Sequence, residues 1–291
     1  MSKIQWTDLT KNPIKEKGGG NYCVPISPGC KNCYASRLNS LGTRFGGNGR
    51  KFGVRPGGHP EVTLNVEMLK KWARMRKPKK IFVCSMTDLF GEWVPDEMIF
   101  EIFDAMADAP KQNFQILTKR PDHMNYIVHQ WILSRGGYQL PANIWPGVSA
   151  EDQQRLDERL IWLLRTETQT RFLSLEPLLG PIELNSSATC SIMEADTSGY
   201  LLDAADLIDW VIIGGESGPD ARPMNLTWVT DILDQCREAG IPAFVKQLGS
   251  VWAKQNGAKH RKGGDPGEWP PEFRVRMMPL HTWYDATCKP I

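Results

Sequence analysis

The sequence predicts an α/β protein, a (β/α)8 barrel of the TIM type that is closed or partly open. Short apolar runs alternate with segments of helical periodicity, and the runs number eight. The chain has 291 residues, somewhat more than the roughly 250 typical of such barrels. Barrel strands are buried on both faces, so they appear as continuous apolar runs. An open doubly wound sheet is the alternative. The predicted strands cover residues 3–7, 61–65, 80–86, 113–119, 143–149, 171–177, 209–215 and 243–249.

Three of the intervening segments show the clearest helical pattern. One has apolar residues along 98–106, and a second carries leucines along 156–164, with Asp152 near its start. A third runs from Trp228 to Cys236 and is ended by Gly240 and Pro242. The simplest domain organisation is one barrel over residues 1–249, with an insertion at about 184–207 and a C-terminal extension, 250–291, packed on the barrel.

Composition is that of an ordinary globular enzyme, but its charge is unevenly distributed. The chain is 41% hydrophobic and 23% charged, with a net charge of +2. Residues 1–80 contain 17 Lys and Arg against 4 Asp and Glu, whereas 81–291 contain 18 against 29. A fibre, a disordered chain and a small disulfide scaffold are excluded. The basic segment favours a polyanionic partner.

No segment of the sequence is typical of a membrane span or a secretion signal. It has no run of about 18 apolar residues, and residues 1–13 lack the apolar core of a signal peptide. We therefore expect a cytoplasmic protein that does not act at a membrane. In a reducing compartment its seven cysteines are not expected to form disulfides.

Polar side chains gather at the carboxyl ends of the predicted strands, where barrel enzymes have their active sites. A helix cap or a buried ion pair is the alternative role for any one of them. The set comprises Asp8, Asn65, Ser85, Asp88, Lys119, Arg120, Ser149, Glu176, Glu216, Ser217, Lys246 and Gln247.

Four of these residues suit catalysis or cofactor binding. Lys119 and Lys246 could each form a Schiff base or bind phosphate. Glu176 and Glu216 could act as a general acid and base, or bind the amino group and ribose of a cofactor. Arg120 could position an anion such as phosphate.

Three cysteines fall within eleven residues: Cys23, Cys30 and Cys33, with the spacing C-x6-C-x2-C. Clustered cysteines in a reducing compartment indicate metal. Structural zinc needs a fourth ligand, such as His59 or Cys84. A 4Fe–4S cluster on three cysteines leaves one iron open, and the lack of a nearby fourth cysteine favours this reading.

The surrounding motifs resemble known families. The segment ending CKNCYA (30–35) is similar to the radical S-adenosylmethionine enzymes, especially the spore photoproduct lyase-like branch. More closely, the chain from about Ile4 to Gly249 resembles a phage-associated three-cysteine-motif family of unknown function. The motifs that carry this resemblance are WTDLTKNP, SPGCKNCYA, TDLFG, LTKRP, GVSAED, SLEPLLGP and GGESGP.

The resemblance implies a cofactor and a type of reaction. Cys23, Cys30 and Cys33 would each ligate one iron, and the fourth iron would bind S-adenosylmethionine, whose cleavage gives a 5′-deoxyadenosyl radical. Tyr34, Ser85, Asp88, Ser149 and Lys246 are the expected cofactor contacts, and an external electron donor would supply the electron. The spacing departs from the usual C-x3-C-x2-C. The Gly214-Gly215-Glu216 motif follows the seventh predicted strand and is not the family's methionine-binding motif, which follows the second.

Basic segments indicate a nucleic-acid or nucleotide substrate. Residues 42–58 contain seven glycines with Arg44, Arg50, Lys51 and Arg55, which could bind phosphates, and two phenylalanines that could stack on bases. A mobile lid is the alternative for this segment. Residues 70–80 and 259–264 are also basic, although a solvated helix face would explain the former.

The predicted function is therefore that of an iron–sulfur radical enzyme that modifies or repairs a nucleic acid or nucleotide. Two alternatives stay open: a barrel lyase or hydrolase with structural zinc, and a non-catalytic nucleic-acid-binding phage factor.

Overall fold

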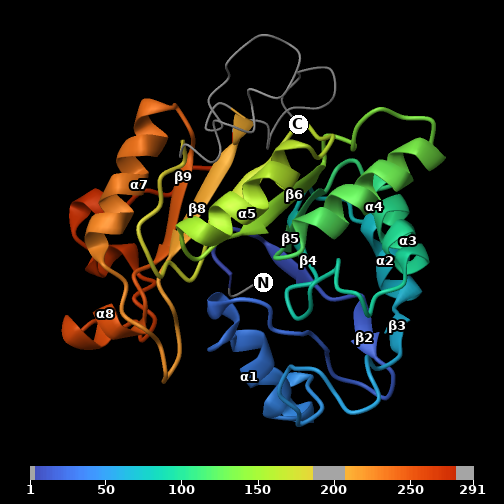
Figure 1. Cartoon of the computed structure of the whole chain (residues 1–291), viewed down its shortest axis with the longest axis horizontal. Helices are drawn as coiled ribbons and strands as arrows, with labels where there is room; N and C mark the ends of the chain where they lie inside the picture. The colour runs from blue at the N-terminus through green and yellow to red at the C-terminus, as the bar shows by residue number, and fades with distance from the viewer. Residues whose placement is uncertain (1–3, 186–206, 280–291) are drawn as a thin grey trace. The chain divides into compact units, whose positions relative to one another are not determined.

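A computed structural model describes residues 4–185 and 207–279 of the chain (Figure 1). The predicted insertion, 184–207, lies almost wholly outside the described residues. The chain divides into two compact units, the first formed by residues 1–147 with 166–169 and the second by 148–165 with 170–291.

Seven strands form the main sheet, in the order β1-β4-β5-β6-β7-β8-β9. The pairs β1–β4, β4–β5, β7–β8 and β8–β9 are parallel. The order follows the chain and never reverses. A doubly wound sheet reverses its order at a switch point, so that alternative is wrong.

The first unit contains the amino-terminal part of this sheet: β1 (Leu9–Lys11), β4 (Lys80–Val83), β5 (Asn113–Thr118) and most of β6 (Ile144–Ser149). The helices after β3, β4 and β5 are α2 (Val66–Ala73), α3 (Asp96–Ala107) and α4 (Pro121–Ser134) (Figure 1). In α3 the predicted apolar stripe is buried through Ile99, Ile102, Phe103 and Met106. The short helix α1 (Tyr34–Ser40) follows the cysteine loop.

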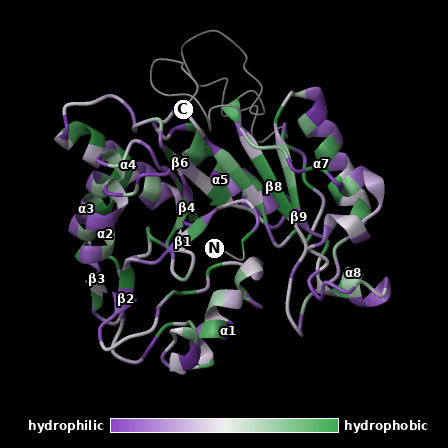
Figure 2. Cartoon of the chain, turned by 180° about the vertical axis from the view of Figure 1, so that it is seen from behind, coloured by the Kyte–Doolittle hydropathy of each residue, from purple (hydrophilic) through white to green (hydrophobic). Residues whose placement is uncertain are grey.

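The second unit contains the end of β6 and the strands β7 (Phe172–Leu175), β8 (Trp210–Gly214) and β9 (Ala243–Gln247). Every residue of β7 and β8 is buried, and Figure 2 shows β8 largely in the hydrophobic colour. The helices are α5 (Gln153–Leu164), α7 (Leu226–Glu238) and α8 (Ser250–Gln255). The α5 helix begins where Asp152 accepts a hydrogen bond from the backbone N–H of Arg155 at 2.9 Å, which is an N-cap.

The first strand prediction was wrong, and the second was confirmed as a strand but not as part of the main sheet. The strand expected at 3–7 is instead Leu9–Lys11, and Ile4–Trp6 lie in a bend and turn. The strand expected at 61–65 exists as β3 (Val62–Leu64), but it pairs antiparallel with β2 (Ile14–Glu16) in a separate two-stranded sheet. Asn65 is the N-cap of α2. In the described residues the main sheet therefore has seven strands, not the eight of a TIM barrel.

The described part of the C-terminal segment packs against β9. The backbone N–H of Val245 donates to Val275 O and that of Met277 to Ala243 O, both at 2.8 Å. Trp210 Nε1 donates to Met277 O at 2.9 Å. No helix in the described residues is long and apolar enough to cross a membrane.

Candidate functional site

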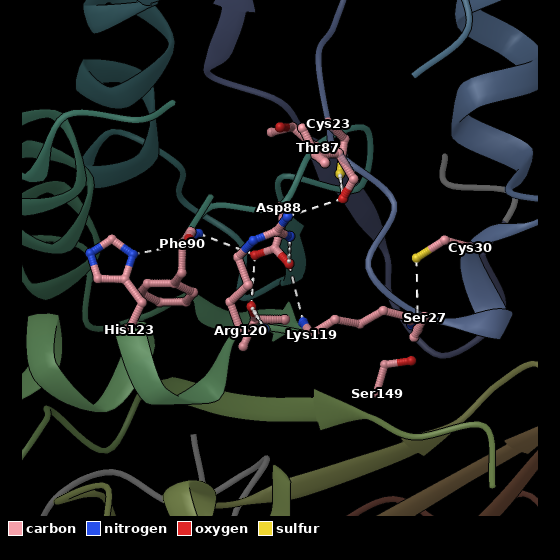
Figure 3. A network of polar contacts seen from close by, with 12 residues as sticks. Cys23, Ser27, Cys30, Thr87, Asp88, Phe90, Lys119, Arg120, His123 and Ser149 are labelled. Atoms are coloured by element: carbon pink, nitrogen blue, oxygen red, sulfur yellow. Dashed lines mark hydrogen bonds and ion pairs between the residues drawn. The ribbon is translucent and has the colours of Figure 1, made fainter. Parts of the chain in front are cut away.

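The three cysteines lie in a loop of the first unit that is hydrogen-bonded to residues just after β4 and β5. Figure 3 shows two of them, Cys23 and Cys30. Thr87 Oγ1, just after β4, donates to Tyr22 O at 2.5 Å. Arg120 Nη2, just after β5, donates to Val24 O at 3.0 Å. The loop therefore lies at the strand ends where barrel enzymes carry their chemistry.

Two tight turns shape the cysteine loop. The Pro28-Gly29 segment forms the 3-10 turn η1 (Pro28–Cys30), in which Cys30 N donates to Ser27 O at 2.9 Å. Cys33 N then donates to Cys30 O at 3.3 Å, and α1 begins at Tyr34. Farther back, Gly53 N donates to Cys23 O at 3.0 Å and so ties the glycine-rich segment to the loop.

The three cysteines are electrostatic neighbours, none is in a disulfide, and each is half-buried. Burial first and the Asp88 carboxylate second raise the pKa of Cys23 to about 12, against the opposing effect of Arg120. Burial also raises the pKa of Cys33, while backbone N–H groups of α1 and the charge of Lys119 oppose it. Metal-free Cys23 is thus a thiol at neutral pH, and a metal must displace its proton to bind.

The two metal hypotheses place different demands on these sulfurs. In the described residues no group of three or more His, Cys, Asp and Glu side chains converges closely enough to hold one metal ion. A single zinc ion needs its ligands to converge on one point. In a 4Fe–4S cluster each cysteine would instead ligate a different iron.

Two residues were considered from the sequence as a fourth zinc ligand, one of them engaged elsewhere and the other buried. His59 Nδ1 lies 3.1 Å from the Tyr22 hydroxyl, and its Nε2 lies 3.4 Å from Glu92 Oε2. Cys84 is buried, and burial raises its pKa to about 12. His59 is thus engaged by Tyr22 and Glu92, and Cys84 is enclosed in the protein directly after β4.

Asp88 and Arg120 form an ion pair beside Cys23, with Nη1 and Oδ2 3.2 Å apart (Figure 3). The Asp88 carboxylate also accepts hydrogen bonds from Phe90 N, Thr118 Oγ1 and Lys119 N. Both side chains are about nine-tenths buried. Asp88 therefore fixes the carboxyl end of β5 and holds Lys119 and Arg120 next to the cysteine loop.

Ser85 and Tyr34 connect β1, β4 and α1. Asn12 Nδ2 donates to Ser85 Oγ at 3.2 Å, and Met86 N donates to Asn12 Oδ1 at 2.9 Å. The Tyr34 hydroxyl donates to Ser85 O at 2.6 Å. The predicted cofactor contacts Tyr34, Ser85 and Asp88 thus belong to one bonded region of the first unit.

In the second unit, Glu176 and Lys246 form an ion pair of 2.8 Å at the ends of β7 and β9. Ser174 Oγ donates to Glu176 Oε2 at 3.2 Å, and Ser149 Oγ donates to Glu176 O at 3.1 Å. The structure thus brings together three residues that the sequence suggested separately, Ser149, Glu176 and Lys246. The ion pair is partly exposed, with side-chain exposures of 13% and 20%.

Glu216 has a structural partner within six residues. Its carboxylate accepts hydrogen bonds from the Arg222 backbone N–H, Nε and Nη2 at 2.6–3.0 Å. The two preceding glycines also have packing reasons, since a Cβ on Gly214 would lie 2.4 Å from Glu176 Oε1 and one on Gly215 2.6 Å from Leu248 O. The motif is thus explained locally, and a general acid–base role for Glu216 stays a prediction.

The predicted phosphate-binding residues divide into engaged and exposed side chains. Arg55 forms a bidentate ion pair with Glu16 and stacks over the Tyr22 ring at 4.9 Å. Arg120 is engaged by Asp88 and Val24 O. Arg44, Arg50 and Lys51 are exposed. Of the five predicted residues, these three are therefore the most accessible to a phosphate.

Sequence reasoning missed an aromatic pair beneath the cysteine loop. The rings of Tyr22 and Trp93 meet edge to face at 5.1 Å, and both are buried. Arg55 lies over Tyr22, and Arg120 over Trp93 at 4.8 Å. Tyr22 directly precedes Cys23 in the sequence, which is the one local signal that could have connected it to the site.

Comparison with protein families matches residues 1–269 to the model of a protein of unknown function (DUF5131). The chain belongs to this family. The DUF5131 match covers the cysteine loop of the first unit and the polar cluster of the second. No curated protein and no solved structure gives a significant match. Because the family description assigns no activity, the function must be argued from the site.

Proposed function

We propose that this protein is an iron–sulfur enzyme of the radical S-adenosylmethionine type, acting in the cytoplasm on a nucleic acid or nucleotide-like substrate. Cys23, Cys30 and Cys33 would hold a 4Fe–4S cluster. The observation that carries the proposal is the single loop of three half-buried, electrostatically coupled cysteines outside any disulfide, tied to the ends of β4 and β5.

The chemistry of the donor set supports a cluster over a single ion. Three thiolates leave one iron without a protein ligand, and the His59 side chain has other partners. The strand order supports a barrel-type β/α arrangement, since it follows the chain from β1 to β9 without reversal. When bound, a reduced cluster supplies the electron that cleaves S-adenosylmethionine, and an external donor would have to reduce it.

Two cations of the protein would offset part of the rise in the cysteine pKa values and so assist the loss of protons to a bound metal. Burial raises the pKa of both Cys23 and Cys33; Arg120 opposes that rise at Cys23, and Lys119 opposes it at Cys33. Asp88 holds both cations in place through its bonds to Lys119 N and Arg120 Nη1. These residues would therefore position positive charge beside the sulfurs, and Lys119 could also approach a substrate.

The remaining proposed roles belong to the polar cluster of the second unit. Glu176 and Lys246 form a partly exposed ion pair, which could exchange a proton or bind an amino acid group of the cofactor. Ser149 would support this role through its bond to Glu176 O. Glu216 would first have to leave Arg222, so Glu176 is the stronger choice for catalysis.

The test is anaerobic reconstitution of the full-length protein with iron and sulfide. We expect about four iron and four sulfide per chain, visible charge-transfer absorbance, and 5′-deoxyadenosine after addition of S-adenosylmethionine and a strong reductant. The triple variant Cys23→Ser, Cys30→Ser, Cys33→Ser should lose the cluster and the product together.

Cys236→Ala is the matched control, because Cys236 is buried in α7 of the second unit. It should retain the full cluster. Full iron binding by the triple variant, or stoichiometric zinc without sulfide after anaerobic purification, would contradict the proposal. A cluster that forms but never cleaves S-adenosylmethionine would retain the iron–sulfur part and overturn the enzymatic part.

A further inference from the structure

A row of exposed side chains follows the cysteine loop along α1 and the 3-10 turn η2 (Thr43–Phe45). Tyr34, Arg37 and Leu41 are spaced i, i+3 and i+7, which places them on one face of a helix. Arg44 and Phe45 follow in η2, which packs next to α1, with the guanidinium 5.8 Å from the ring centre. We call these five residues the α1 stripe.

The α1 stripe exposes apolar surface. Tyr34, Leu41 and Phe45 are 41%, 54% and 50% exposed. Five of the ten large hydrophobic side chains that are exposed in the described residues lie between residues 26 and 54. Such a concentration indicates a surface that binds something, whereas scattered single exposures do not.

The charge around the stripe has one sign. From residue 17 to residue 60 the chain contains seven Lys and Arg and no Asp or Glu. Arg55 is neutralised by Glu16 of β2, whereas Arg37 and Arg44 of the stripe are exposed. Arg50 and Lys51 of the following segment are also exposed. An occupant of this surface must therefore be anionic.

The stripe has a rigid backing, because the buried side chain of Asn39 joins α1 to the glycine-rich segment. Asn39 Nδ2 donates to Asn48 Oδ1 and to Arg50 O, each at 2.8 Å, and its Oδ1 accepts from Asn21 N at 2.8 Å. Phe52 N donates to Ser36 Oγ at 3.0 Å. The segment is thus held against the helix, and its exposed groups are ordered before any partner arrives.

We propose that the α1 stripe binds single-stranded nucleic acid, with bases stacked on Phe45 and Tyr34 and phosphates on Arg37 and Arg44. This inference rests on the proposed function and specifies its substrate class. A single strand exposes its phosphates, which the arginines of the stripe can bind, and the flat faces of its bases, which can stack on the aromatic rings. A duplex hides its base faces inside the helix, so the apolar part of the stripe would have no partner there.

Tyr34 also connects the stripe to the proposed chemistry. It directly follows Cys33, and its hydroxyl is bonded to Ser85 O at the end of β4. Its ring is therefore fixed beside the cysteine loop. A strand stacked along the α1 stripe would reach that loop at Tyr34.

Binding can be measured by fluorescence anisotropy with a labelled oligothymidylate of about 15 nucleotides, using the full-length reconstituted protein. We expect Phe45→Ala to weaken binding by about tenfold, because it removes one stacking platform. Phe45→Trp should retain the affinity. Replacing Arg37 and Arg44 by Gln should reduce the slope of log K against log salt by about 0.7 for each phosphate that the protein no longer neutralises.

Tyr138→Ala is the control, since Tyr138 is 82% exposed, also in the first unit, but outside the basic segment. It should leave binding unchanged. Equal affinity for a duplex, an unaffected Phe45→Ala variant, or displacement by polyglutamate with the same dependence on Phe45 would overturn the inference. The last result would indicate an acidic protein partner.

Iron and sulfide content, measured on the same variants, separates the two proposals. We expect the stripe variants to keep a full cluster. If the protein forms the cluster but does not bind the oligonucleotide, this inference alone is overturned. If no cluster forms, the proposed function is overturned, and the binding inference is then tested with the metal-free protein.

Discussion

At the scale of single residues, Arg120 is the side chain on which most contacts beside the cysteine loop depend. It pairs with Asp88, donates to Val24 O and lies over the Trp93 ring. The loop, the end of β4 and the end of β5 are thus connected through one guanidinium. Its predicted role as a phosphate ligand would break these contacts, so a structural role explains the residue better.

Arg120→Met should destabilise the first unit by about 2–4 kcal/mol, because it leaves the buried Asp88 carboxylate without its ion-pair partner and Val24 O without a donor. The free energy of unfolding from urea denaturation measures this. Arg155→Met removes an i,i+3 pair with the half-exposed Glu158 and should change stability by less than about 0.5 kcal/mol. Equal losses in the two variants would show that Arg120 does not hold the loop.

At the scale of elements, α1 and the glycine-rich segment form one unit through Asn39. This seven-residue helix is too short to be stable alone. The backbone of the segment is hydrogen-bonded to Asn39, Ser36 and Cys23. The glycines and arginines of the segment are evident in the sequence. The buried side-chain amide that binds the segment belongs to Asn39 within α1, which no sequence motif marks.

Asn39→Ala should lower the free energy of unfolding by about 3 kcal/mol, since three buried hydrogen bonds are removed at about 1 kcal/mol each. Hydrogen exchange should show faster exchange of the amides between residues 46 and 53. Ser40→Ala, one residue further on, removes only a bond to Arg37 O at the exposed side of α1 and serves as control. Unchanged exchange in Asn39→Ala would mean that the segment is held by other contacts.

At the scale of the whole molecule, the uneven distribution of charge along the chain matters more than the net charge. Residues 1–80 carry 17 basic against 4 acidic side chains although the chain as a whole is near neutral. A partner responds to the local potential within about a Debye length, roughly 8 Å at physiological salt, and not to the net charge.

The chain should therefore bind a cation-exchange column at about pH 8.5, above its isoelectric point of about 8.1. The triple variant Arg44→Gln, Arg50→Gln, Lys51→Gln should elute at clearly lower salt. Replacing Lys254, Lys259 and Arg261, which lie in the second unit, is the matched control and should have a smaller effect. Passage of the wild-type chain through the column without retention would contradict a concentrated basic surface.

The six later strand predictions were confirmed within a few residues, from β4 to β9, because buried parallel strands have a strong local pattern. The first strand was predicted at 3–7 but lies at Leu9–Lys11. The second was confirmed as a strand, but it does not belong to the main sheet, for a reason that lies outside any local window. Val62–Leu64 has strand propensity, but its partner is Ile14–Glu16, and pairing between segments this far apart is not encoded in periodicity.

By itself, the sequence determined the α/β class, the clustering of Cys23, Cys30 and Cys33, and the concentration of basic residues in 1–80, because each follows from order and spacing along the chain. Only the tertiary structure decided which polar residues are partners: Asp88 with Arg120, Glu16 with Arg55, Glu216 with Arg222 and Glu176 with Lys246. An ion pair is a meeting of side chains in space, and folding alone determines which charges are satisfied inside the protein and which remain open to a partner.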